Sequence, residues 1–239
     1  MPNDTTVTTI AGLSELVESQ FKDDKLTTVL YRGHGAASFV PRPKVGRLFP
    51  PANSAKKTVN EALMLELFRR QSTDRVEVAA VDDWELLAIA QHHGLVTRLL
   101  DWTRSPLAAL YFCVRNEHET RDSLGRPRCE DEILAWRCAK EDLSKPLPEC
   151  SPLKVKAVVR YIPRIVTSRL RAQSGVFTAH PAPTLEFKPD GKIVRIRIPY
   201  AHRKALKDSL FRHQIHEGTM FPDLDGLARH IEWCQTKGY

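Results

Sequence analysis

The sequence has no apolar run that approaches the roughly 20 residues needed to cross a bilayer. Its first residues, MPNDTTVTTIAGLSEL, lack the basic start and the apolar stretch of a secretion signal. The five cysteines are scattered, odd in number and without a CxxC pair, so they suit neither a disulfide framework nor a zinc site. We therefore expect a cytoplasmic protein with reduced thiols and no membrane contact.

Several catalytic motifs are also missing. There is no GxSxG nucleophile turn and no GxxxxGK[ST] phosphate loop, which disfavours hydrolases with a covalent enzyme intermediate and P-loop enzymes. HExxH spacing is absent as well, and the adjacent His92 and His93 point about 100° apart on a helix, so they cannot easily share an ion. We expect no metal site.

Positive charge is in excess, with a formal net charge of +7. Many of the cations lie between residues 154 and 213, in RYIPRIVTSRLR, KIVRIRIPYAHRKALK and LFRHQ. Such a stripe could bind nucleic acid or the pyrophosphate of a dinucleotide. The alternative is a solvated surface of lysines and arginines, and charge runs alone do not separate the two.

The two halves of the chain differ in their hydrophobic pattern. The first half predicts helices at 11–21, 57–70, 82–93 and from Pro106 onward, and one strand ending at Gly33. The second half contains short strand-like runs, DEILAWRCA, LKVKAVVRYI, GVFTAH and KIVRIRIP. We expect an α+β fold in which a helix-rich N-terminal half packs on a mixed or antiparallel sheet. Residues 1–24 would form an N-terminal helix and residues 25–235 a single domain.

The central stretch AQHHGLVTRLLDWTRSPLAALYF, residues 90–112, places polar side chains between apolar runs. We interpret 97–103 as a short connector before a helix that Ser105 caps and Pro106 begins, and as one wall of a pocket. Its tryptophan could stack on a flat ring while the arginine and aspartate orient polar groups. Alternatively, Arg98 and Asp101 pair with each other and Trp102 is core. The candidate ligand-binding residues here are Gln91, His93, Thr97, Arg98, Asp101, Trp102 and Thr103.

Two further candidates come from opposite ends of the chain. Arg32 stands at the end of the first strand, beside a long loop rich in proline and glycine. Glu217 precedes a glycine near the C-terminus and is the best candidate for a catalytic carboxylate, whereas Asp223 and Asp225 suit helix capping.

Three segments together resemble the FRG domain, which is named for an aromatic-Arg-Gly motif. They are YRGH at 31–34, the central stretch at 90–112 and HEGTMFPDLDGLARHI at 216–231, so the resemblance extends from about residue 25 to 235. The order of these motifs is also similar to that of ADP-ribosyltransferases, which use NAD as substrate.

The second resemblance implies a role for each matching residue. Arg32, with Gly33, would hold the pyrophosphate or ribose of NAD, Thr103 would take the hydroxyl position, and Glu217 would be the catalytic acid. Ile215 stands where enzymes that modify arginine or small GTPases have Glu or Gln, which disfavours those targets. A Ser-Thr-Ser strand motif is missing, which leaves the role of Thr103 open.

The resemblance therefore implies an NAD-dependent ADP-ribosyltransferase. Its acceptor would be nucleic acid or another macromolecule, and its setting antiphage defence or a toxin–antitoxin system with an antitoxin partner. Two alternatives stay open: a sensor domain that binds a nucleotide or nucleic acid without chemistry, and a metal-independent nuclease that uses His93 and Asp101.

Overall fold

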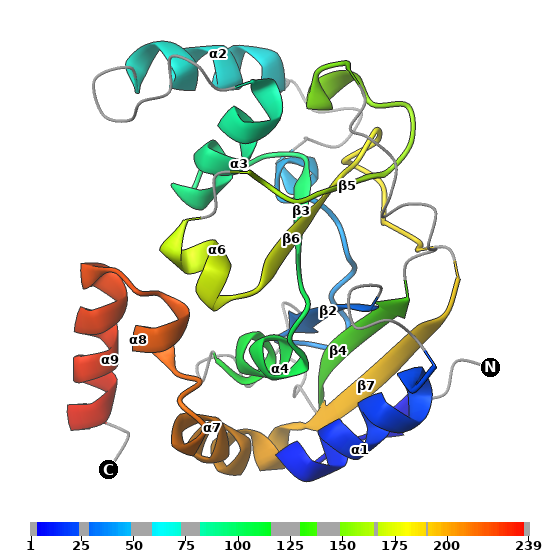
Figure 1. Cartoon of the computed structure of the whole chain (residues 1–239), viewed down its shortest axis with the longest axis vertical. Coiled ribbons are helices and arrows are strands. Elements are labelled where there is room, and N and C mark those ends of the chain that lie inside the picture. Colours follow the sequence, from blue (N-terminus) through cyan, green and yellow to red (C-terminus); the bar gives the residue numbers. More distant parts are fainter. Residues whose placement is uncertain are drawn as a thin grey trace.

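A seven-stranded mixed sheet organises the protein (Figure 1). The computed structural model describes residues 4–23, 29–48, 59–72, 82–115, 130–137, 149–164, 167–189 and 191–236. The strand order is β1-β7-β4-β2-β3-β6-β5, with β1 parallel to β7 and the other neighbours antiparallel. The α+β prediction is confirmed. The strands are β1 Asp4–Thr6, β2 Val29–His34, β3 Leu99–Thr103, β4 Glu130–Arg137, β5 Val159–Tyr161, β6 Gly175–Ala179 and β7 Ile193–Pro199.

One face of the β1-β7-β4-β2 part of the sheet is apolar and is covered by helices. Val194, Ile196 and Ile198 alternate along β7 and are buried in the same core cluster as Tyr31. The helices α1 (Ile10–Phe21), α4 (Pro106–Val114) and α7 (Arg203–Arg212) supply many of the other residues of this core. Because side chains alternate along a strand, the residues between the apolar ones point to the other face.

Helix α4 lies directly against β2. It begins as the sequence predicts, with Pro106 in its first turn and the Ser105 hydroxyl accepting a hydrogen bond from the Ala108 N–H at 3.2 Å. A Cβ atom added at Gly33 would lie 2.0 Å from the Ala109 carbonyl oxygen. Glycine at position 33 therefore allows the helix and the strand to approach closely.

A second core lies under β3, β6 and β5, in the upper part of Figure 1. It contains residues of α2 (Glu61–Gln71) and α3 (Asp83–His92), whose predicted bounds were close. Predicted positions 57 and 58 lie outside the described residues. The Asp82 carboxylate caps α3 by accepting from the Glu85 N–H at 2.9 Å. The remaining short elements are η1 Val45–Arg47, η3 Pro152–Lys154, α6 Ser168–Ala172, η4 Tyr200–His202 and α8 Glu217–Met220.

The other face of the sheet carries a third, aromatic cluster. Trp102 packs against Trp136 and Phe187, with ring centroids 5.2 and 6.1 Å away. The Phe187 N–H bonds the Pro41 carbonyl at 2.8 Å, which ties the loop after β6 to the loop after β2.

Three stretches differ from the sequence interpretation. Of the strand-like run LKVKAVVRYI, only Val159–Tyr161 forms a strand, and Pro152–Lys154 forms a 3-10 helix. The expected connector at 97–103 contains β3, a strand with neighbours on both sides. Its burial pattern is not a simple alternation, because Leu99 and Leu100 are both buried before the exposed Asp101. The segment before α1 also forms a strand, β1, which joins the sheet beside β7.

The last helix of the described residues is α9 (Leu224–Thr236), at the left edge of Figure 1. Of the helices in the described residues, none combines the length and the apolar character needed to cross a membrane.

Candidate functional site

The sheet opens between its two central strands. β2 and β3 pair only at Tyr31 and Thr103, whereas β2 runs alongside β4 from Val29 to His34. Arg32 lies at this opening, which we call the fork. Its guanidinium donates to the main-chain carbonyl of Asp101 through Nη1 and to His34 through Nε, at 3.0 Å. A half-buried arginine thus bridges the two parts of the sheet.

The side chain of Asp101 is exposed at the fork. One of its oxygens accepts a hydrogen bond from the Gln91 side-chain amide at 2.7 Å. The orientation of that amide is set from the other side, because the Thr97 hydroxyl donates to the Gln91 oxygen. Asp101 is therefore an oriented carboxylate that stays accessible to solvent.

Arg169 lies on α6 and contacts Phe221, the residue that follows α8. Its guanidinium lies 4.5 Å from the ring centroid of Phe221, and no carboxylate of the described residues lies within ion-pair distance of it. Burial lowers the pKa of Arg169, the carboxylate of Asp101 opposes this shift, and Arg115 adds to it. The charges of Asp101 and Arg115 thus both act on the guanidinium of Arg169.

Three arginines surround the ring of Phe221. The guanidinium carbons of Arg115, Arg169 and Arg229 lie 4.4, 4.5 and 5.5 Å from its centroid. Guanidinium groups stack favourably on aromatic faces. We call these three residues with Phe221 the arginine cluster.

Glu217 neutralises part of the arginine cluster. Its carboxylate lies 2.8 Å from Arg115 and 2.7 Å from Arg229, and it accepts a hydrogen bond from the Tyr111 hydroxyl. Burial by itself raises the pKa of Glu217, but the hydrogen bonds from Tyr111 and Arg229 and the two positive charges hold it below its usual value. The side chain is only 14% exposed, so its charge is largely committed to these partners.

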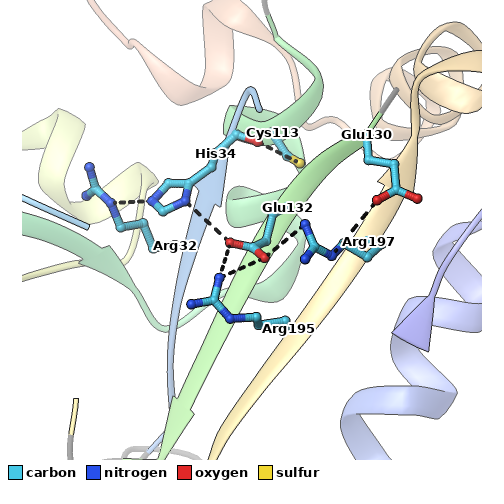
Figure 2. Close-up of polar contacts among 7 residues, drawn as sticks. All are labelled: Arg32, His34, Cys113, Glu130, Glu132, Arg195 and Arg197. Atoms are coloured by element: carbon cyan, nitrogen blue, oxygen red, sulfur yellow. Dashed lines mark hydrogen bonds and ion pairs between the residues drawn. The ribbon is translucent and has the colours of Figure 1, made fainter. Parts of the chain in front are cut away.

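Arg32 contacts a buried polar cluster, which Figure 2 shows. His34 and Glu132 are 5% and 0% exposed, and the His34 Nδ1 lies 3.8 Å from the Glu132 carboxylate. Arg195 contacts both oxygens of Glu132 at 2.9 and 3.0 Å, and Arg197 lies 3.4 Å from one of them. These residues come from β2, β4 and β7 on the face away from α4.

The protonation state of His34 determines whether it can hold Arg32. Burial lowers the pKa of His34, and the nearby charge of Arg32 lowers it further, although Glu132 opposes the shift. His34 is therefore neutral, and its Nε2 accepts the hydrogen from Arg32. The cluster orients the guanidinium that bridges the fork.

Several residues that were predicted to bind a ligand instead make contacts within the protein. Arg98 pairs with Glu61 at 2.7 Å rather than with Asp101. Trp102 is 3% exposed and donates to Thr178 at 3.0 Å, and Thr103 donates to the Gln173 carbonyl at 2.6 Å.

His93 is exposed, and its ring packs edge-on against His92 with centroids 4.9 Å apart. The described contacts of His93 do not include Asp101, whose carboxylate is held by Gln91 instead.

The structure thus groups Arg32, Gln91, Thr97 and Asp101 at the fork, whereas Glu217 is paired with two arginines of the arginine cluster. Sequence reasoning missed His34, Glu132, Arg169 and Phe221. The alternation of Glu130 with Glu132 and of Arg195 with Arg197 was a visible signal for charge on one strand face. No comparable signal marks Arg169 or Phe221, because their contacts join distant segments.

Part of the predicted basic stripe is paired with acids. Arg195 and Arg197 meet Glu132, Arg164 meets Asp82 at 2.5 Å, and Arg203 meets Asp131 at 2.6 Å. Across the described ranges, no three His, Cys, Asp or Glu side chains are grouped as a metal site would require.

Residues 27–122 match the family model of the FRG domain. This FRG segment contains Arg32, Gln91, Thr97 and Asp101, but Arg169 and Glu217 lie outside it. No curated protein and no solved structure matches the chain.

Proposed function

We propose that the protein binds NAD at the fork and transfers its ADP-ribose to a macromolecule. The observation that carries this proposal is the link between Arg32 and Asp101: a bridging guanidinium beside an exposed, oriented carboxylate. Both residues belong to the FRG segment.

The fork and the arginine cluster together complement the parts of a dinucleotide. Arginine binds phosphate oxygens in a bidentate manner, which suits Arg32 and Arg169 to a pyrophosphate. A carboxylate accepts hydrogen bonds from ribose hydroxyls, the contact that Asp101 is placed to make. The ring of Phe221, with its stacked cations, lies next to Arg169 and could contact a base.

The reaction requires a carboxylate whose charge is available. When the N-glycosidic bond breaks, nicotinamide leaves with the bonding electrons and positive charge develops on the ribose, where an anion stabilises it. An acceptor oxygen or nitrogen then bonds the anomeric carbon and loses its proton to the carboxylate or to water. Asp101 has one amide partner, whereas two guanidinium groups already neutralise Glu217. We therefore assign the stabilising role to Asp101 and a positioning role to Glu217, which holds Arg115 and Arg229.

NAD labelled separately in its nicotinamide and ADP-ribose parts tests this assignment. The wild-type protein should release nicotinamide and label DNA, RNA or a lysate protein, and Asp101→Asn should lose both. Asp83→Asn is the matched control, because Asp83 is a carboxylate of α3 that pairs with Arg69. Glu217→Gln should weaken NAD binding yet keep measurable turnover. If Glu217→Gln abolishes turnover and Asp101→Asn does not, the two roles are exchanged.

Binding without chemistry is the second candidate function. It is favoured by the charge balance, since Glu217 is already paired with Arg115 and Arg229 of the arginine cluster. It predicts saturable NAD binding, lost in Asp101→Asn, with the ligand recovered unchanged. A protein that neither binds nor consumes NAD with any of these acceptors would overturn the proposal.

The proposed role in antiphage defence or in a toxin–antitoxin pair can be tested by measuring bacterial growth. Expression of the wild-type chain in bacteria should arrest growth, and Asp101→Asn should relieve the arrest. A neutralising partner would be a protein whose co-expression restores growth with wild type.

A further inference from the structure

One face of α9 carries a line of apolar side chains that are exposed to solvent. Leu224, Leu227 and Ile231 are 82%, 47% and 53% exposed, and Ala228 is exposed as well. Residues three, four and seven positions apart lie on one side of a helix, so these four residues form a continuous line, which we call the α9 stripe. Single exposed apolar residues are common on protein surfaces, but a contiguous apolar patch indicates a contact surface.

The opposite face of α9 attaches the helix to the rest of the protein. Gly226 is buried, and a Cβ atom added there would lie 1.8 Å from the Phe221 carbonyl oxygen. Trp233 packs on Phe211, with ring centroids 5.6 Å apart. Gly226 is two residues from Leu224 and therefore lies about 200° away from it around the helix axis. The α9 stripe thus points away from the molecule, at whose left edge α9 lies in Figure 1.

Acidic side chains flank the α9 stripe on one side. Asp225 and Glu232 are exposed and lie seven positions apart, so both project from the same flank of the helix. The only lysine or arginine in the sequence of α9 is Arg229, whose Nε lies 2.7 Å from the Glu217 carboxylate. The charge beside the stripe is therefore negative, although the chain as a whole has a net charge of +7.

We propose that the α9 stripe binds an amphipathic helix of another protein, whose own apolar stripe is flanked by lysines or arginines. The apolar side chains of the two helices interdigitate, and the cations of the partner pair with Asp225 and Glu232. With 13 residues, α9 offers the partner about 20 Å of helix. The α9 stripe shares no residue with the proposed NAD site, so this inference goes beyond the proposed function and does not depend on it.

The acidic flank disfavours two other occupants of the α9 stripe. If a second copy of the chain packed its α9 antiparallel to the first around a twofold axis, Asp225 of one copy would lie near Glu232 of the other, and like charges repel. An anionic membrane surface would be repelled by the same two carboxylates. A basic partner helix supplies the apolar contact without either repulsion.

Two synthetic peptides, titrated with the full chain, test the proposal. Each has about 18 residues, long enough to form a helix in water, with leucine at every third or fourth position. The other positions are lysine in one peptide and glutamate in its twin. Fluorescence anisotropy should show that the lysine peptide binds at least about tenfold more tightly, although the net charge of +7 favours the glutamate peptide. Equal binding of the two peptides, or tighter binding of the glutamate peptide, would overturn the proposal.

Variants without a change of charge locate the contact. Leu227→Gln combined with Ile231→Gln should weaken binding of the lysine peptide by about tenfold or more, because the apolar surface of the stripe is lost. Leu63→Gln combined with Leu67→Gln is the matched control, since these leucines of α2 are 51% and 42% exposed. The control should bind the peptide as wild type does. Retained affinity in the α9 variant, or an equal loss in the α2 variant, would place the peptide elsewhere and overturn the proposal.

A charge reversal tests the acidic flank separately and leaves the α9 stripe intact. In a chain with both Asp225→Lys and Glu232→Lys, the glutamate peptide should bind more tightly than the lysine peptide. If the lysine peptide is still preferred, the acidic flank does not select the partner and the proposal fails.

Two further measurements on the wild-type chain address the other occupants. Sedimentation should show neither dimers nor binding to vesicles of phosphatidylglycerol through the α9 stripe. A dimer, or vesicle binding, that is lost in the variant with Leu227→Gln and Ile231→Gln would assign the stripe to a second copy or to a membrane and overturn the proposal.

Discussion

The guanidinium of Arg32 donates to the main-chain carbonyl of Asp101 across the opening between β2 and β3. The contact joins residues 69 positions apart and spans the two parts of the sheet. The same guanidinium also donates a hydrogen bond to His34 at 3.0 Å. A positive group with two fixed protein contacts is preorganised, so a phosphate that binds it does not have to order the side chain.

Replacing Arg32 by lysine tests whether NAD binding depends on the positive charge alone or also on the planar geometry of the guanidinium. Lysine keeps the positive charge but cannot donate to His34 and Asp101 in the planar arrangement that guanidinium provides. We expect NAD affinity to fall about 10- to 100-fold, equivalent to roughly 1.4–3 kcal/mol. Calorimetric titration measures this loss. Arg47→Lys is the control, because Arg47 is exposed and should change affinity little. Equal affinities in both variants would show that Arg32 does not contact the ligand.

Glycine at position 33 should be essential for packing, whereas glycine at position 35 should not. In Gly33→Ala the new methyl group would meet the Ala109 carbonyl at 2.0 Å and the Cys113 nitrogen at 2.8 Å. Overpacking of this kind costs about 1–3 kcal/mol or more, and both obstacles are backbone atoms that cannot rotate away. In Gly35→Ala the nearest atom is 3.8 Å away, so stability should change little. Urea unfolding of both variants measures the difference, and equal losses would contradict this account of the YRG motif.

The sequence predicted most of the secondary structure from local signals. The Ser105–Pro106 start of α4 and the Asp82 cap of α3 lie where the pattern indicates, because capping depends on residues three or four apart. β3 was missed because its polar residues Asp101 and Thr103 resemble those of a connector.

The site was predicted only in part, for a related reason. Arg32 and Asp101 belong to motifs, and so both were candidates. The arginine cluster unites residues 115, 169, 221 and 229, and no local pattern reports that tertiary packing will place them around one ring. Charge is equally non-local: Arg195 looks available in the sequence and meets Glu132 across a strand pair.

Acid should destabilise the protein through His180. Trp102 donates to the Thr178 hydroxyl, and that hydroxyl lies 2.8 Å from the His180 Nε2, which must be unprotonated to accept. Burial, with added repulsion from Arg32 and Arg98, lowers the pKa of His180 from 6.5 to about 4. The unfolded chain therefore binds this proton first as pH falls, so stability is full above about pH 6.5 and declines toward pH 4.

The expected loss from His180 is on the order of 3 kcal/mol across that window. Burial shifts the pKa of His34 in the same direction, so it adds to the decline. Urea unfolding from pH 7.5 downward measures the slope. His180→Gln keeps an acceptor without a titrating group and should flatten the curve. A His180→Gln curve as steep as that of wild type would assign the effect to other groups.

The pair between Arg98 and Glu61 should support stability rather than ligand binding. Arg98 and Glu61 are 10% and 11% exposed, and Arg98 also donates to the Leu153 carbonyl at 3.1 Å. Removing one partner of a buried pair strands the other charge and typically costs about 3–5 kcal/mol, so Glu61→Ala should approach the lower value. Glu66→Ala on the same helix breaks an exposed pair with Arg70 and should cost under about 1 kcal/mol.

Affinity measured on the folded fraction of these variants tests the role of Arg98 directly. If Arg98 only connects α2 to the start of β3, NAD affinity per folded molecule should be the same in Glu61→Ala, Glu66→Ala and wild type. If Arg98 instead contacts the ligand, its release from Glu61 should change affinity even after correction for unfolding. The second result would return Arg98 to the binding site and extend that site from the fork toward α2.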